Sequence, residues 1–231
     1  MLEILDNILL SDDVTNEFYK NYDNKDFKTW ILSILPEIED CKNQQQDNPW
    51  HIYSVLNHIL HSVEEMNKQT KNMPLKTRRM LAYTMFLHDI GKPKCYLRRY
   101  SKLYDREVDS FFKHNEVSQK IAKRVLQDFK FNIQQRREIS LLVKEHDIFM
   151  FITLEDDGNK YHKVLSQDLI NGYIKQFKNI GDGRKLLSWL VKVGKADNRA
   201  QNPEMTKDAC KMLDVFESML LQNQNKQENE I

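Results

Sequence analysis

The chain has few of the residues that interrupt helices. Its 231 residues include only 6 glycines and 5 prolines, whereas these two types usually make up about 12% of a soluble protein. The shortage argues against a turn-dense all-β architecture and against the Gly-rich loops that cradle phosphates. Leu, Lys, Gln, Glu and Met are plentiful and are good helix formers. The composition therefore predicts a mostly helical protein.

Long apolar runs and a disulfide framework are also lacking. Runs such as 141–143 and 148–152 contain only a few residues, whereas a membrane-spanning helix needs about 20. The N-terminal segment carries acidic residues where a signal peptide needs basic ones. The three cysteines, Cys41, Cys95 and Cys210, are far apart and form no CxxC pair. We therefore expect free thiols in a reducing cytoplasm and no membrane partner.

Positive and negative charges balance over the whole chain but not locally. The net charge is +1, so the molecule as a whole has no general attraction to nucleic acid or to an anionic membrane. Between Lys68 and Arg106, however, six Lys and five Arg face only two acids, Asp89 and Asp105. This excess is either a solvated basic face or a surface that holds an anionic substrate, and the sequence leaves both open.

Apolar residues recur at helical spacing along most of the chain and predict an all-α bundle of about eight to ten helices. Two short amphipathic helices should open the chain. A longer helix should begin at Pro49, since proline is favoured in a first helical turn, and continue to about Met66. Another should begin at Pro74 and lead to His88, before Gly91-Lys92-Pro93 ends it.

The segment at 94–109 is basic, rich in tyrosine and without a clear period, which indicates a loop or a short irregular helix. No segment alternates in the way typical of a strand. We divide the chain into N-terminal helices at 1–45 that pack on a main domain at 46–205, followed by a C-terminal helix with a frayed tail at 206–231.

Four residues form the clearest candidate metal site: His58, His88, Asp89 and Asp197. Neutral imidazole and carboxylate groups suit divalent ions such as Mn, Fe, Co, Ni, Zn or Mg. Adjacent His88 and Asp89 point in different directions on a regular helix, so both reach one ion only where the helix ends. Gly91 and Pro93 supply that ending.

These residues and their surroundings resemble the HD-domain metal-dependent phosphohydrolases. The likeness is carried by LHDIGK at 87–92 and KADN at 195–198, and it covers about residues 30–205. It is closest to the HD domain of bacterial CCA-adding tRNA nucleotidyltransferases, on the evidence of NPWH at 48–51, FKHNE at 112–116 and VKEHD at 143–147. The nucleotidyltransferase head is absent, because no Gly-Gly or Gly-Ser precedes a paired Asp-x-Asp.

The resemblance implies an HD-domain helical bundle that binds one or two divalent ions. It implies one ion on His58, His88, Asp89 and Asp197, and a second on His114 and His146 with Asp89 as the bridge. Asp89 and Lys92 would be the catalytic residues, with Lys92 neutralising a phosphate oxygen and Asn198 or Arg199 assisting in substrate binding. Of the other histidines, His51 would lie beside the site, His61 competes with His58 for the first ligand position, and His162 would be exposed.

The function implied is hydrolysis of a phosphomonoester or phosphodiester of a nucleotide or RNA end by metal-activated water. A pair of ions about 3.5–4 Å apart clamps a phosphate in such sites. One alternative is a non-catalytic module that binds a nucleotide or RNA. Another is a partner subunit of a separate tRNA nucleotidyltransferase, docked through the N-terminal helices. We expect no DNA partner, and the sequence leaves the substrate, the metal and the oligomeric state open.

Overall fold

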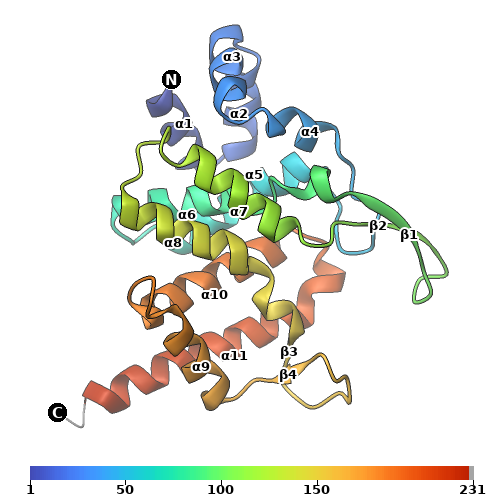
Figure 1. Cartoon of the computed structure of the whole chain (residues 1–231), viewed down its shortest axis with the longest axis vertical. Coiled ribbons are helices and arrows are strands. Elements are labelled where there is room, and N and C mark those ends of the chain that lie inside the picture. Colours follow the sequence, from blue (N-terminus) through green and yellow to red (C-terminus); the bar gives the residue numbers. More distant parts are fainter. Residues whose placement is uncertain (229–231) are drawn as a thin grey trace.

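The computed structural model describes the backbone of residues 1–228 and the side chains of residues 1–222. Within this part the chain is 66% helical, which confirms the all-α class (Figure 1). The helices are α1 (Leu2–Leu9), α2 (Val14–Tyr22), α3 (Lys25–Ile34), α4 (Glu37–Asn43), α5 (Val55–Thr70), α6 (Leu75–His88), α7 (His114–Val125), α8 (Ile133–Glu145), α9 (Gln167–Phe177), α10 (Gly183–Arg199) and α11 (Pro203–Glu228). None of them is long and apolar enough to cross a membrane.

Helix α6 lies at the centre of the bundle and packs against α5, α7, α8 and α10. Its residues from Met80 to His88 are all buried, so this part of the helix is enclosed on every side, as expected for a helix surrounded by others. Helix α5 crosses beside it, and α10 packs against both. The last residue of this central helix, His88, therefore lies deep inside the protein.

Four helices, and not the two expected, open the chain and cover one end of the bundle (Figure 1). Asp13 and Asn24 divide this segment, because each side chain accepts hydrogen bonds from backbone N–H groups and caps the next helix. Phe18 of α2 is fully buried, and its ring centroid lies 6.1 Å from that of Phe86 on α6. The N-terminal helices thus share the core of the main domain.

Two further expectations about local structure were wrong. The helix expected to start at Pro49 starts at Val55, where the Ser54 side chain accepts from Asn57 N and caps it. The segment at 94–109 is not a loop or an irregular helix: after the 3₁₀ helix η1 (Lys92–Cys95), β1 (Leu97–Ser101) pairs antiparallel with β2 (Arg106–Ser110). Side chains of β1 are exposed or half-buried on both faces, so no apolar alternation marks the strand.

The C-terminal part contains a short pair of strands between its helices. A second 3₁₀ helix, η2 (His146–Phe151), leads to β3 (Ile152–Thr153), which pairs in parallel with β4 (Lys163–Val164). Helix α11 packs along α10 and continues into the segment expected to fray. The last three residues of that expected tail lie outside the described part of the chain. The three cysteines are free, as expected.

We predict that Phe18→Ala lowers the free energy of unfolding by about 3–5 kcal/mol, because it leaves a cavity between α2 and α6. Denaturant unfolding followed by circular dichroism measures this. Ile133→Ala on the exposed start of α8 is the control and should change stability by about 0.5 kcal/mol or less. Equal effects of the two substitutions would show that the N-terminal helices are not part of the core.

Candidate metal centre

The ends of several helices meet on one side of the bundle and carry the candidate ligands. His88 is the last residue of α6, and Asp89 follows as its C-cap with φ −110° and ψ 4°, outside the helical region. The helix therefore ends where the sequence predicted. His114 is the first residue of α7, and His146 directly follows α8. Because these residues stand at helix ends, their side chains are free to turn toward a common point.

Gly91 allows α7 to approach this point closely. A Cβ atom at Gly91 would lie 2.6 Å from the backbone nitrogen of Ser118 and 2.8 Å from the carbonyl oxygen of His114, too close for any other residue. The backbone N–H of Gly91 also donates to Ser118 Oγ at 2.9 Å. The glycine of the LHDIGK segment thus brings His114 to Asp89.

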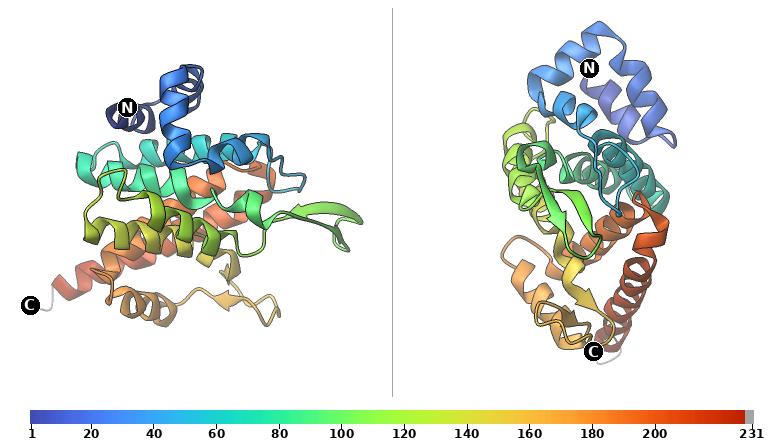
Figure 2. Two further views of the ribbon diagram at one scale, coloured as in Figure 1. Left: turned by 45° about the horizontal axis from the view of Figure 1, so that its top comes forward. Right: turned by 90° about the vertical axis from the view of Figure 1, so that its right-hand side faces the viewer.

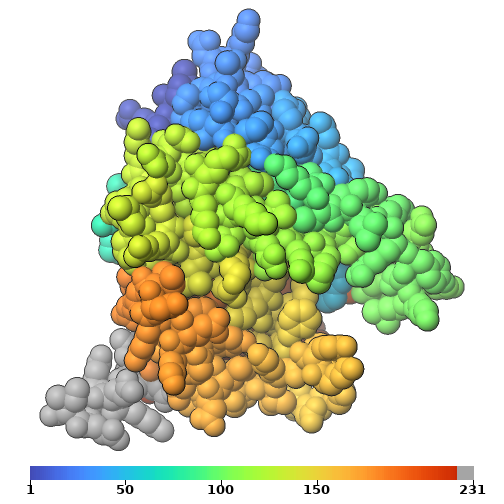
Figure 3. Space-filling view, viewed as in Figure 1, coloured from blue at the N-terminus to red at the C-terminus, as the bar shows by residue number. Residues whose placement is uncertain are grey.

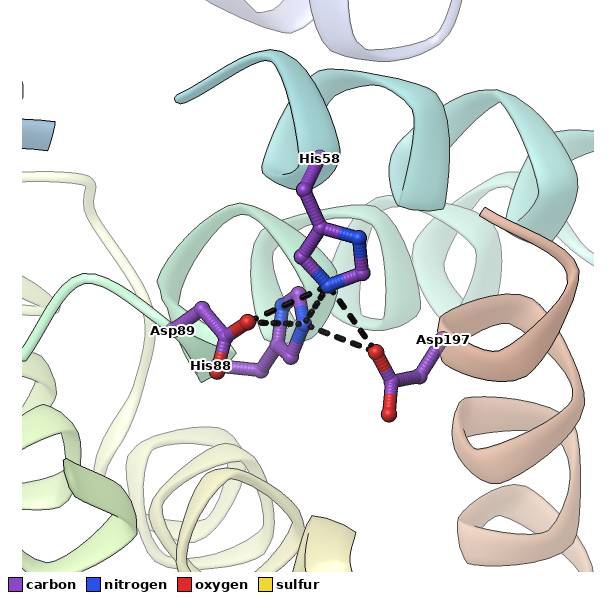
Figure 4. A group of neighbouring side chains, drawn as sticks. All are labelled: His58, His88, Asp89 and Asp197. Carbon is purple, nitrogen blue, oxygen red and sulfur yellow. Dashed lines mark hydrogen bonds and ion pairs between the residues drawn. The ribbon is translucent and has the colours of Figure 1, made fainter. Parts of the chain in front are cut away.

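The first cluster contains the four residues predicted as ligands (Figure 4). His58 Nε2 lies 3.1 Å from Asp89 Oδ2 and 3.0 Å from Asp197 Oδ1. His88 Nε2 lies 3.3 Å and 3.5 Å from the same two oxygens. All four residues are buried. One donor atom from each lies within 4.8 Å of the others, so the group could hold a metal ion.

The second cluster joins Asp89 to His114 and His146. Asp89 Oδ1 lies 3.0 Å from His114 Nε2 and 3.5 Å from His146 Nε2. The two oxygens of Asp89 therefore point into different clusters, Oδ2 into the first and Oδ1 into the second. This is the arrangement in which one carboxylate serves two neighbouring cations.

The four histidines share one hydrogen-bonding pattern that fixes which nitrogen carries the proton. Each Nδ1 faces a backbone carbonyl oxygen, at distances of 3.2, 2.6, 2.8 and 2.8 Å for His58, His88, His114 and His146. A carbonyl only accepts, so each Nδ1 donates, and each neutral ring keeps its lone pair on Nε2. This is the state in which imidazole binds a metal.

When the rings are neutral, these lone pairs face one another in pairs. Nε2 of His58 lies 3.3 Å from Nε2 of His88, and Nε2 of His114 lies 3.1 Å from that of His146. Both oxygens of Asp89 are buried, and neither accepts a well-aligned hydrogen bond. Such a concentration of acceptors needs cations or extra protons to be stable. The donor set therefore fits one or two divalent ions.

The pKa values show how the cluster compensates its charge through protons. Burial disfavours the charged form of His88, but Asp89 and Asp197 outweigh it and raise its pKa from 6.5 to about 10. Burial likewise opposes ionisation of Asp89, yet His88 and Lys92 hold its pKa well below the usual range. Metals bind deprotonated imidazole, so a bound ion takes the place of such a proton.

Lys92 lies beside the clusters and is buried. Its Nζ is 2.6 Å from Asp89 Oδ2, 2.9 Å from Gln46 Oε1 and 3.0 Å from His51 Nε2. Burial and the Lys92 charge lower the pKa of His51 well below its usual range, and its Nδ1 lies 2.8 Å from Asn48 Oδ1. His51 is thus a neutral acceptor for Lys92, beside the site as expected.

The structure does not bring the other two candidate substrate residues to the clusters. Asn198 donates its side-chain amide to Gly194 O, one turn earlier in its own helix. Arg199 is exposed and follows Asp197 by two positions, about 200° around the helix, so it points away. His61, the competitor of His58, contacts Glu64 instead.

Asp147 is a site residue that the sequence reasoning missed. Its carboxylate lies 3.2 Å from His146 Nε2 and 3.4 Å from His114 Nε2. The signal was present, because Asp147 completes a second His-Asp pair in the chain. Asp147 also lines a cavity of about 270 Å³ together with Asn115, Lys144, Phe151, Tyr161 and Lys163. The second cluster therefore borders a surface cavity.

Comparison with known proteins adds no assignment: no protein-family model matches the chain, and no curated protein matches it. The likeness to the HD-domain phosphohydrolases stays a prediction from the motifs. The geometry itself shows a buried His/Asp group that could hold a metal, with the identity and the number of ions left open.

We predict that metal content separates the two clusters. Elemental analysis of protein loaded with Mn²⁺ should find two ions per chain, one ion in His146→Ala, and none in Asp89→Ala, since Asp89 belongs to both clusters. His162→Ala is the control, because His162 contacts Asp157 outside the clusters, and it should keep both ions. Two ions in His146→Ala would make that residue a neighbour of the site rather than a ligand.

Proposed function

We propose that the protein is a metal-dependent phosphohydrolase that cleaves a phosphomonoester or phosphodiester of a nucleotide or an RNA end. The observation that carries the proposal is the position of Asp89, whose two oxygens face two separate pairs of imidazole nitrogens. Two adjacent metal sites that share one carboxylate are suited to phosphoester hydrolysis.

Two groups of residues would each hold one metal ion. His58, His88, Asp89 and Asp197 would hold one ion, and Asp89, His114 and His146 a second. Such ions, when bound, polarise a phosphoryl oxygen and lower the pKa of a water molecule so that it attacks near neutral pH. The backbone carbonyls that accept from each Nδ1 keep the imidazoles oriented for this task.

Lys92 supports the reaction with a fixed positive charge. Gln46 and His51 hold its ammonium group on one side and Asp89 on the other. A buried ammonium in this position stabilises the negative charge that develops on a phosphate oxygen. The cavity bordered by Asp147, Phe151 and Tyr161 offers space for the part of the substrate that is not phosphate.

The two alternatives are less well supported. A binding module without turnover would not need the full ligand set, and all six candidate ligands lie in the two clusters. A partner subunit docked through the N-terminal helices would need their apolar faces free. Residues such as Leu5, Phe18 and Ile31 are instead buried within this chain.

We predict that Lys92→Met lowers kcat/KM for bis(p-nitrophenyl) phosphate in the presence of Mn²⁺ by about 10²–10³-fold, the effect of removing one donor to a developing charge. Metal content should stay at the wild-type level. Lys120→Met is the matched control, because Lys120 is exposed on α7, and it should hydrolyse the ester like the wild type. Absence of turnover by the wild-type protein across phosphoesters and metals would contradict the proposed function.

A further inference from the structure

The β1–β2 hairpin stands off the helical body next to the metal centre (Figure 2). Both strands of the hairpin are joined to residues of the site. β1 follows the short helix that begins at Lys92, and β2 continues through Phe111 to His114. Lys92 Nζ lies 5.6 Å from the centroid of the Phe111 ring, and Phe111 O accepts from His114 Nδ1. The hairpin is therefore connected at both ends to residues of the metal centre.

The acidic groups of the hairpin are already engaged. Arg98 forms ion pairs with Asp109 at 2.9 Å, with Glu107 at 3.3 Å and with Asp47 of the neighbouring loop at 2.8 Å. Arg106 contacts Asp47 as well, at 2.8 Å. Asp105, the remaining acid, accepts a hydrogen bond from the hydroxyl group of Tyr100. Asp47, Glu107 and Asp109 are therefore paired with arginine, whereas Asp105 keeps its charge beside a neutral hydroxyl group in the turn of the hairpin.

Three basic side chains of the same segment remain available. Arg99, Lys102 and Lys113 are exposed, and none of them forms an ion pair or a side-chain hydrogen bond with the residues that the structure describes. Three positive charges thus extend from the tip of the hairpin to the edge of the metal centre. An extended polyanion complements them better than a single phosphate does.

Three aromatic side chains of the same segment are exposed as well, although Arg99 and Tyr100, as consecutive strand residues, point to opposite faces of the hairpin. Tyr96, Tyr100 and Phe112 are 45%, 58% and 78% exposed. Lys113 Nζ lies 5.7 Å from the centroid of the Phe112 ring. In the space-filling view the hairpin forms a lobe that projects from the side of the molecule (Figure 3). Exposed cations and exposed rings on a projecting hairpin are suited to binding single-stranded nucleic acid, through phosphates and through stacked bases.

We propose that the exposed surface of this hairpin binds a single strand of nucleic acid and leads its end to the metal centre, with Arg99, Lys102 and Lys113 contacting phosphates and Tyr96, Tyr100 and Phe112 contacting bases. The inference deepens the proposed function, because it names a strand rather than a free nucleotide as the substrate. Hydrolysis of the bound strand depends on the proposed function, but binding of the strand by the hairpin does not. The two are therefore tested separately.

The test is fluorescence anisotropy with a labelled, unstructured 12-nucleotide RNA in EDTA, so that no turnover occurs. The double variant Arg99→Glu/Lys102→Glu should bind at least ten-fold more weakly and reduce the slope of log K against log salt by about 1.4. Phe112→Ala should bind at least five-fold more weakly, because a base loses its stacking partner, with an unchanged slope. DNA of the same sequence shows whether the 2′-hydroxyl contributes to the binding.

Lys207→Glu/Lys211→Glu is the matched control, since it reverses the same amount of charge on exposed residues of α11. It should bind RNA like the wild type, and all variants should keep wild-type metal content and hydrolysis of bis(p-nitrophenyl) phosphate. Equal RNA affinity of the hairpin variants and the wild type, or no binding by the wild type, overturns the inference. The inference is also overturned if the wild-type protein is a dimer and the hairpin variants are monomers, because the surface would then be a protein interface.

The outcomes separate this inference from the proposed function. RNA binding that depends on the hairpin, without hydrolysis of any phosphoester, supports the surface and contradicts the hydrolase. Hydrolysis of the chromogenic ester without RNA binding supports the hydrolase and contradicts the hairpin surface. The protein would then be a phosphohydrolase that acts on small substrates.

Discussion

The structure depends on a single buried carboxylate that faces imidazoles on both sides. Asp89 is enclosed by α5, α6, α7 and α8, and each of its oxygens meets two Nε2 atoms. Burying a charge costs several kcal/mol unless opposite charge compensates it. In the described chain the Lys92 ammonium group, 2.6 Å from Asp89 Oδ2, supplies part of that compensation. Divalent ions would supply more of it, and this is why the fold and the proposed chemistry belong together.

The helices satisfy this requirement through their ends rather than their faces. A residue inside a helix has its direction set by the helix axis, whereas a residue at an end can turn toward a neighbour. The backbone carbonyl of the residue three positions earlier orients the imidazole ring of His88, His114 and His146. The carbonyls of Met85 and Val143 lie in the last turns of α6 and α8 and have no partner within the helix, whereas Phe111 O also accepts from His114 N. Helix termination and imidazole orientation are therefore one structural feature.

The sequence predicted the parts that depend on periodicity and on motif spacing. Helical periodicity indicated the all-α class, and the His-Asp pair before Gly91 located the end of α6. The roles suggested for Asn198 and Arg199 came from adjacency to Asp197, which fails on a helix because successive side chains diverge by about 100°. The hairpin was not predicted because β1 lacks a buried face and β2 shows no apolar alternation. Asp147 escaped because its contact with His114 arises from tertiary packing.

Anomalous X-ray diffraction from crystals of the protein grown with Mn²⁺ would show whether Asp89 joins two metal sites. We expect two anomalous peaks, one among His58, His88, Asp89 and Asp197 and the other among Asp89, His114 and His146. A single peak, or peaks only on the surface away from Asp89, would contradict it.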